Sequence, residues 1–192
     1  DAFREMARPA LMNAMGLLIP AMGELNVKNL GKEERGGYTL VCLRIGANAR
    51  KEALPVLLYV PASKAMKGTV AIAHGDGKAA LADLETGGPG PLVKALLADG
   101  RAVLAFDAFL TGEHNMPGNR TERLKKSFSD TFLPTDTAYR VQDALTAIAF
   151  ARGSEYARGP VDLVGIGEGG LWSLFAGAVD GDVRAVIADA NQ

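Results

Sequence analysis

The apolar positions near the start of the chain have helical spacing. They recur every three or four residues over the first 18 residues, with Pro9 among them, which predicts one or two short amphipathic helices. The positions are Phe3, Met6, Ala7, Ala10, Leu11, Ala14 and Leu18. From Tyr38 the period falls to two. Residues 38–45 and 55–61 therefore predict two strands, and the polar turn between them favours an antiparallel pair.

Strands and helices alternate along the rest of the chain. The apolar pattern predicts strands at 69–73, 102–106, 161–164 and 183–188, and helices at 92–98, 136–152 and 171–179. This order predicts an α/β fold with a mostly parallel sheet and helices on both faces. The polar stretch Thr111 to Asp130 has no clear period, and loops of that length are often functional.

Composition excludes several classes of function. The chain has 192 residues, which fits one domain, and its 21 basic and 22 acidic residues give a net charge of −1. Such a balance argues against binding to nucleic acid or to an anionic membrane. The basic run Arg120 to Lys126 is interrupted by Glu122 and is expected to be a solvated surface. No apolar stretch is long enough to predict a membrane span.

The single cysteine and the beginning of the chain add two expectations. Cys42 lies in a predicted strand and is expected to be a buried structural thiol, since no other cysteine could form a disulfide with it. The chain begins at Asp1 without the layout of a signal peptide, which indicates a processed product or a fragment. We divide it into a helical or connecting segment, 1–30, and a main domain, 31–192.

A glycine-rich turn follows the strand at 161–164. The sequence from 164 to 170 is Val-Gly-Ile-Gly-Glu-Gly-Gly, which has the pattern of a nucleophile elbow, G-x-S-x-G, with Gly167 in place of serine. Glycine accepts the positive φ of such a turn, but it has no atom that can attack a carbonyl carbon. The pattern therefore favours the fold of an elbow protein and argues against its usual chemistry.

Two further segments occur in the order expected for an elbow protein. His74-Gly75 directly follows the strand at 69–73, and Phe106-Asp107 with Thr111-Gly112-Glu113 follows the next strand. Together with the elbow, these segments make residues 38–189 resemble the α/β-hydrolase superfamily, in particular its acetyl xylan esterase and dienelactone hydrolase branch. The second segment resembles a D-x-x-G-x-G motif with looser spacing.

This resemblance implies roles for particular residues. Gly167 stands at the nucleophile, the backbone N–H of Glu168 forms half of the oxyanion hole, and Asp76 lies near the other half. His74 and Gly75 belong to the oxyanion loop, where the family role of the histidine is structural. Gly165 and Gly169 complete the degenerate elbow. We assign no catalytic residue: Ser173 is expected to point into packing, Glu168 to be solvated, and His114 to lie in a loop.

The resemblance also bears on activity and partners. The family's catalytic acid and histidine come from loops beyond Gln192, so we expect a fold related to carboxylic-ester hydrolases, truncated after the sixth strand and inactive alone. The implied ligand is a small ester or an acylated sugar, without cofactor or metal, and the implied compartment is extracellular or periplasmic. Strand 183–188 would be an open edge that a further domain or chain covers, as in tandem proteins with one degenerate copy.

A second hypothesis explains the same glycines. Gly165, Gly167 and Gly170 match the dinucleotide fingerprint G-x-G-x-x-G after a strand, and Asp189 ends the following strand about 20 residues later. In this hypothesis the glycines admit the pyrophosphate of NAD or FAD and Asp189 binds a ribose hydroxyl. The fingerprint normally opens its domain, however, and here several predicted strands precede it.

Overall fold

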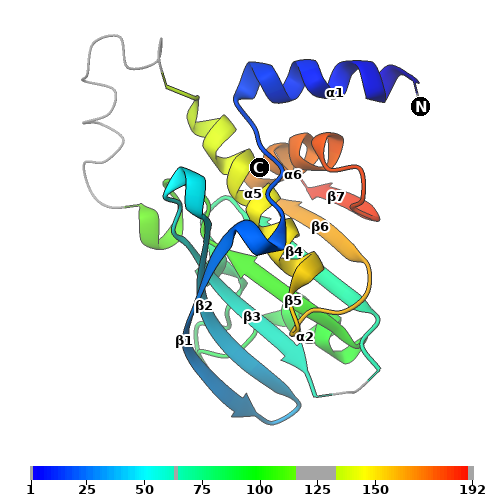
Figure 1. Ribbon diagram of the computed structural model, residues 1–192. Helices are drawn as coiled ribbons and strands as arrows, with labels where there is room; N and C mark the ends of the chain where they lie inside the picture. Colours follow the sequence, from blue (N-terminus) through cyan, green and yellow to red (C-terminus); the bar gives the residue numbers. More distant parts are fainter. Residues whose placement is uncertain (1, 63–64, 116–132, 190–192) are drawn as a thin grey trace.

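The computed structural model describes residues 2–62, 65–115 and 133–189. Figure 1 shows the path of the chain from the N-terminal helix to the last strand. The described helices are α1 (Ala2–Met15), α2 (Pro91–Ala98), α5 (Asp136–Gly153) and α6 (Glu168–Val179). The described strands are β1 (Leu25–Arg35), β2 (Tyr38–Ala47), β3 (Leu54–Pro61), β4 (Gly68–His74), β5 (Arg101–Phe106), β6 (Val161–Ile166) and β7 (Ala185–Asp189).

All seven strands form one mixed sheet. Its order is β1-β2-β3-β5-β4-β6-β7, with β1, β2, β3 and β5 paired antiparallel and β5, β4, β6 and β7 paired parallel. The predicted antiparallel pair is confirmed, with Cys42 opposite Leu57. The predicted α/β class and the parallel half of the sheet are confirmed as well. Cys42 is half-buried and free.

The sheet has one strand more than predicted. The extra strand is β1, in which Leu25 is buried and the following ten residues are exposed. A strand with no buried face lacks the alternation of apolar and polar residues by which strands are recognised in a sequence. It begins before residue 31, so the paired strands extend across the predicted boundary between 1–30 and 31–192.

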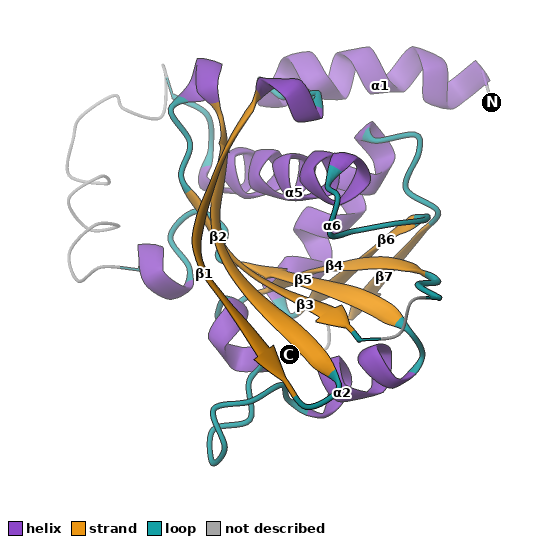
Figure 2. Cartoon of the chain, turned by 60° about the horizontal axis from the view of Figure 1, so that its bottom comes forward, coloured by secondary structure: helices purple, strands orange, loops and turns teal. Residues whose placement is uncertain are grey.

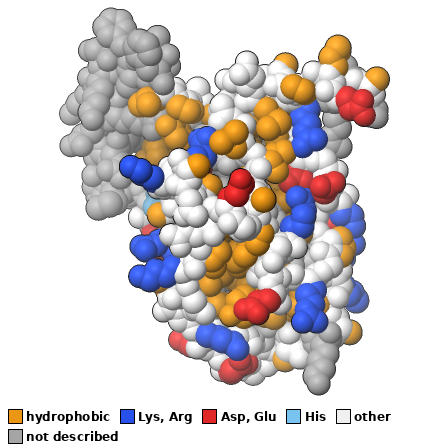
Figure 3. Space-filling model, in the orientation of Figure 1, with side chains coloured by type: hydrophobic (Ala, Val, Ile, Leu, Met, Phe, Trp, Pro, Cys, Tyr) orange, Lys and Arg blue, Asp and Glu red, His pale blue; other side chains and the backbone are white. Residues whose placement is uncertain are grey.

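Helices cover both faces of the sheet, as predicted (Figure 2). On one face α5 and α6 bury Leu145, Ile148 and Trp172 against the strands, and α1, a single helix with Pro9 inside it, packs outside α6. On the other face α2 buries Val93 in a smaller cluster. None of the described helices is long and apolar enough to cross a membrane. On the face shown in Figure 3, Lys and Arg side chains are interspersed with Asp and Glu.

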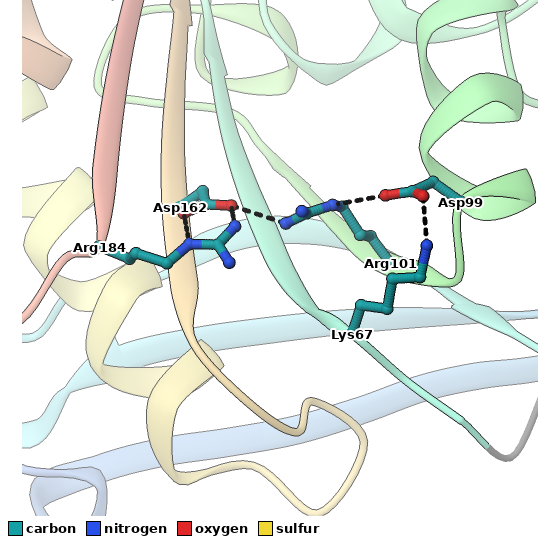
Figure 4. Close-up of polar contacts among 5 residues, drawn as sticks. All are labelled: Lys67, Asp99, Arg101, Asp162 and Arg184. Carbon is teal, nitrogen blue, oxygen red and sulfur yellow. Dashed lines mark hydrogen bonds and ion pairs between the residues drawn. The ribbon is translucent and has the colours of Figure 1, made fainter.

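A row of alternating charges crosses the N-terminal ends of the parallel strands (Figure 4). Its ion pairs join Lys67 to Asp99 at 2.6 Å, Asp99 to Arg101 at 2.9 Å and Arg101 to Asp162 at 2.8 Å. Arg184 completes the row by donating to Asp162 from its Nε at 2.8 Å. The Asp162 side chain is only 10% exposed and has an arginine on each side, so its charge is compensated.

Candidate active-site elbow

The turn from β6 into α6 has the geometry of a nucleophile elbow. β6 pairs in parallel with β4 on one side and with β7 on the other, and Gly167 follows it with φ 60° and ψ −130°. The helix begins at Glu168, three residues before the predicted start. The Gly167 N–H donates to the carbonyl of Asp189 at 2.8 Å, which fixes the turn against the end of β7. The expected unusual conformation of Gly167 at the strand tip is therefore present.

Close packing requires glycine at two positions of the turn, and backbone conformation requires it at a third. A Cβ on Gly165 would lie 2.2 Å from the Gly169 carbonyl oxygen, and a Cβ on Gly169 would lie 2.1 Å from that of Ala73. These two glycines let α6 begin in direct contact with β6 and β4. A Cβ on Gly167, by contrast, would meet no atom within 4 Å. Position 167 is therefore restricted by its backbone conformation alone, and a side chain there would project into open space.

The loop after β4 lies beside this turn, as the resemblance implies. The Gly75 N–H donates to the Ile166 carbonyl at 3.1 Å, and a Cβ on Gly75 would lie 3.3 Å from the Glu168 nitrogen. The Asp76 N–H, which the resemblance places near the oxyanion hole, donates to Nδ1 of His74 at 3.0 Å. The Glu168 N–H belongs to the first turn of α6, where amide groups have no acceptor within the helix.

The two segments enclose one cavity of about 430 Å³. Its walls are polar and come from the loop after β4, the loop after β5, the start of α5 and the elbow. The lining residues are His74, Gly75, Asp76, Leu110, Asn115, Arg140, Gly167 and Glu168. The structure thus brings together the predicted oxyanion loop and the predicted elbow. His114 contacts the Ala53 carbonyl at 3.0 Å and lies on a different cavity, and Ser173 is fully buried against β6, as expected.

Arg140 is a residue of this cavity that the sequence pattern did not single out. It lies in the predicted helix 136–152, where a lone arginine on a helix is normally solvated. Here it is buried: its Nη1 is 3.0 Å from a Glu168 carboxylate oxygen, its Nε donates to the Phe109 carbonyl at 2.9 Å, and its Cζ lies 4.8 Å from the Trp172 ring centre. Glu168 is therefore exposed but ion-paired.

Asp107 connects the two loops that flank the cavity. One carboxylate oxygen accepts the backbone N–H of Lys78 at 2.6 Å, and the other accepts the N–H of Glu113 at 3.0 Å and the Lys78 ammonium at 2.5 Å. The same ammonium pairs with the Glu113 carboxylate. A Cβ on Gly112 would lie 2.2 Å from Asp107 Oδ1, so this glycine is needed for the approach. Asp107 and Gly112, which belong to the segment predicted to resemble a D-x-x-G-x-G motif, therefore hold the two loops together.

Other predicted positions lie apart from the cavity or outside the described residues. Asp189 ends β7 next to Ile166 of β6, and its side chain is exposed. Residues 116–132, which contain the run Arg120 to Lys126 and most of the long polar loop, lie outside the described part of the chain. In the described part, no group of three His, Cys, Asp or Glu side chains could hold a metal ion.

Comparison with known proteins gives matches in structure alone. No protein-family model and no curated protein matches the sequence. A candidate acetyl xylan esterase from Bacteroides fragilis superposes with a TM-score of 0.73 at 16% identity, over 96% of this chain and 52% of its own. The glucuronoyl esterase from Solibacter usitatus superposes with a TM-score of 0.66 at 18% identity, over 94% of this chain and 57% of its own. Dienelactone hydrolase from Anabaena variabilis superposes with a TM-score of 0.55 at 19% identity, over 79% of this chain and 62% of its own.

These solved structures match the fold of the chain as a whole. Most are carboxylic-ester hydrolases by name, and the chain spans between about half and 62% of the length of the three. At these identities the likeness establishes the fold. The chain therefore has the α/β-hydrolase fold that these esterases and the dienelactone hydrolase share.

Proposed function

We propose that the elbow cavity is a binding site for a small ester or an acylated sugar and that this chain alone does not hydrolyse it. One observation carries the proposal. Gly167 has the strained backbone of an elbow, with open space beyond it, and the residue has no nucleophilic atom. The site retains the geometry of an ester-binding turn while lacking the group that attacks.

The remaining polar groups suit recognition of an ester. The Glu168 N–H points from the start of a helix, where backbone donors favour an oxygen that carries partial negative charge. Arg140 is fixed by three contacts and so presents its guanidinium in one orientation. A nucleophile, a base and an acid must act together in the serine hydrolases, so a backbone donor and an arginine can hold a carbonyl but not cleave it.

Turnover of nitrophenyl acetate by the purified chain tests the lack of catalysis. We expect no hydrolysis above the buffer rate, and Gly167→Ser should not restore it, because no base is expected beside the new hydroxyl. Saturable turnover that is lost in His74→Ala would show that the chain has an active site that we have misplaced.

Binding is tested separately by titration with an acetylated xyloside while the ligand methyl signals are followed by NMR. We expect line broadening that is reduced in Gly167→Asn, because asparagine tolerates positive φ and fills the open space. Leu84→Asn on an exposed loop is the matched control. Equal broadening in all three proteins would contradict binding at the elbow.

The dinucleotide hypothesis remains an alternative because of one feature of the sheet. β6 and β7 are neighbours, so the exposed Asp189 side chain ends the strand next to the glycine turn, as a ribose-binding carboxylate would. Titration calorimetry with NAD, NADP and FAD decides between the two. Micromolar binding that weakens in Asp189→Ala would favour the alternative, and no binding would favour the ester site.

A further inference from the structure

A second and larger cavity, of about 560 Å³, adjoins the elbow cavity. Three segments build it: the loop between β2 and β3, the loop after β5, and the first half of α5. Leu110 lines both cavities. The predicted ester site uses none of the other residues of this second cavity, so its chemistry can be considered separately.

Backbone strain in the described residues is concentrated at this cavity. Lys51, with φ 54°, and Leu110, with φ 60°, are the only non-glycine residues of the described chain with positive φ, and both line it. Such conformations are unfavourable for residues with a Cβ and persist when their surroundings enforce them. At Leu110 hydrogen bonds of the preceding residue hold the backbone in this conformation. The Phe109 N–H donates to Asp143 at 2.7 Å, and the Phe109 carbonyl accepts from Arg140 Nε at 2.9 Å.

Asp143 presents a carboxyl group to the cavity. One oxygen accepts the Phe109 N–H, and the other accepts no hydrogen bond from the described residues. Burial raises the pKa of Asp143 to about 8, and the nearby Glu52 carboxylate adds to the rise, whereas the Phe109 N–H, Arg50 and Arg140 oppose it. At neutral pH the group is therefore a carboxylic acid with an O–H to donate.

One cationic group of the cavity has no ion-pair partner among the residues that the structure describes. Arg50 pairs with Glu52 at 2.8 Å, and Glu52 also accepts from Thr146 at 3.0 Å. The Lys51 ammonium, by contrast, forms no ion pair with any described residue, although the strained backbone places its side chain on the cavity wall. The cavity therefore offers one uncompensated positive charge.

Two aromatic rings also line the cavity, next to Glu113, whose carboxylate pairs with Lys78, and His114, which contacts the Ala53 carbonyl. The rings of Phe109 and Tyr139 lie with their centres 4.8 Å apart and their planes at 34°. Both line the cavity. Aromatic side chains provide apolar contact for a flat ligand, and a few polar groups then fix its orientation.

We propose that this cavity binds a small carboxylate with a flat, apolar body. The ligand carboxylate lies between the Lys51 ammonium and the O–H of Asp143, and its body contacts Phe109 and Tyr139. A neutral ligand would leave Lys51 uncompensated, and a cationic one would be repelled by it. This site is independent of the elbow, because no residue of the ligand contact belongs to the turn at Gly167.

Binding of benzoate, benzamide and benzylamine, measured by ligand-observed NMR at about pH 6 and about pH 9, tests the proposal. At the lower pH we expect benzoate to bind at least about tenfold more tightly than either analogue, and at the higher pH its affinity should fall about tenfold because Asp143 ionises and repels it. Equal binding of benzoate and benzamide, or preference for benzylamine, would overturn the proposal.

Two variants separate the contributions of Lys51 and Asp143 to benzoate binding. Lys51→Asn removes the charge while keeping a residue that tolerates positive φ, and it should weaken benzoate about tenfold. Lys28→Met, on exposed β1, should leave the affinity unchanged. Asp143→Asn keeps a donor that cannot ionise, so benzoate should bind equally at both pH values. Unchanged affinity in Lys51→Asn would contradict the proposal even if Asp143→Asn did not fold.

Discussion

Gly165 and Gly167 stand two residues apart in the same turn, and substitution affects them for opposite reasons. At Gly167 only the backbone is strained, so Gly167→Ala should destabilise the protein by about 1–2 kcal/mol. At Gly165 the new methyl would collide with the Gly169 carbonyl, and backbone cannot move aside as a flexible side chain can. We therefore expect Gly165→Ala to lower the free energy of unfolding by about 3 kcal/mol or more.

Urea unfolding of the two variants, followed by circular dichroism, measures this difference. Both variants change glycine to alanine, so each serves as the control for the other. If Gly165→Ala were as stable as Gly167→Ala, the start of α6 could move away from β6 with little loss of free energy. That result would contradict the close packing described above.

Asp143 gives the folded protein a dependence on pH. Its pKa is raised to about 8 in the folded state, from an ordinary value of 3.8. Between these values the folded state binds the extra proton, so its stabilising contribution is complete below about pH 4 and is lost as the pH rises through about 8. In that window the free energy of unfolding should fall by at most about 1.4 kcal/mol per pH unit.

Thermal unfolding of the wild-type protein and Asp143→Asn between about pH 5 and pH 9 checks this dependence. We expect the difference in midpoint to grow in favour of Asp143→Asn as the pH rises, because asparagine does not ionise. Parallel curves for the two proteins would show that Asp143 does not titrate in this range.

Asp107 acts between elements, because it joins the loop after β4 to the loop after β5. Its side chain is 1% exposed and Lys78 is 8% exposed, so Asp107→Ala leaves a buried ammonium with Glu113 alone. Removing one partner of a buried pair typically destabilises a protein by about 3–5 kcal/mol. We expect a loss of that size in a urea titration.

The control for this variant is Asp76→Ala, in the loop after β4 that Asp107 contacts, with its side chain 89% exposed. It should change stability by less than about 0.5 kcal/mol. Equal losses in the two variants would indicate that the loops are held by something other than the Asp107 carboxylate.

Prediction from sequence succeeded for elements with a buried face and failed where burial gives no pattern. The helix at 136–152 and the strands β4, β5 and β6 bury most of their apolar residues, and each is present within a few residues of its predicted bounds. β1 has one buried residue and could not be recognised by period. The start of α6 was predicted three residues too late. Its first turn contains Glu168, Gly169 and Gly170, which give no apolar pattern.

The candidate site was predictable where backbone geometry requires a residue type. Glycine at 167, and the His74-Gly75 pair after a strand, indicated the turn and the loop beside it. Arg140 and Asp143 were not predictable, because a polar residue on a helix is normally solvated. Their burial depends on where the loop after β5 passes over α5, which is a contact between residues 31 and 34 positions apart.

For the whole molecule, β7 is one of the two edges of the sheet, opposite β1. Among the described strands it pairs with β6 alone, and its Ile187 side chain is 60% exposed. We propose, as the predicted strand 183–188 suggested, that another strand covers this edge. Unpaired strand edges with apolar side chains favour association, so the isolated 192-residue chain should self-associate through β7.

Sedimentation velocity over a range of concentrations tests this proposal. Ile187→Lys should shift the protein toward monomer, because an edge lysine opposes strand pairing, whereas Leu84→Lys, at a position 94% exposed elsewhere, should not. If the wild-type protein were a monomer at all concentrations and β7 showed fast amide exchange, no other strand would pair with this edge and the proposal would be wrong.

The row of charges from Lys67 to Arg184 ties together the beginnings of the parallel strands, whereas the elbow, the His74 loop and Leu110 lie where such strands end. This row of ion pairs and the ligand-facing residues therefore occupy opposite rims of the sheet. Substitution of a residue that faces the cavity leaves this row of ion pairs intact. A protein arranged in this way can vary the groups that face a ligand while one set of ion pairs keeps the beginnings of its parallel strands aligned.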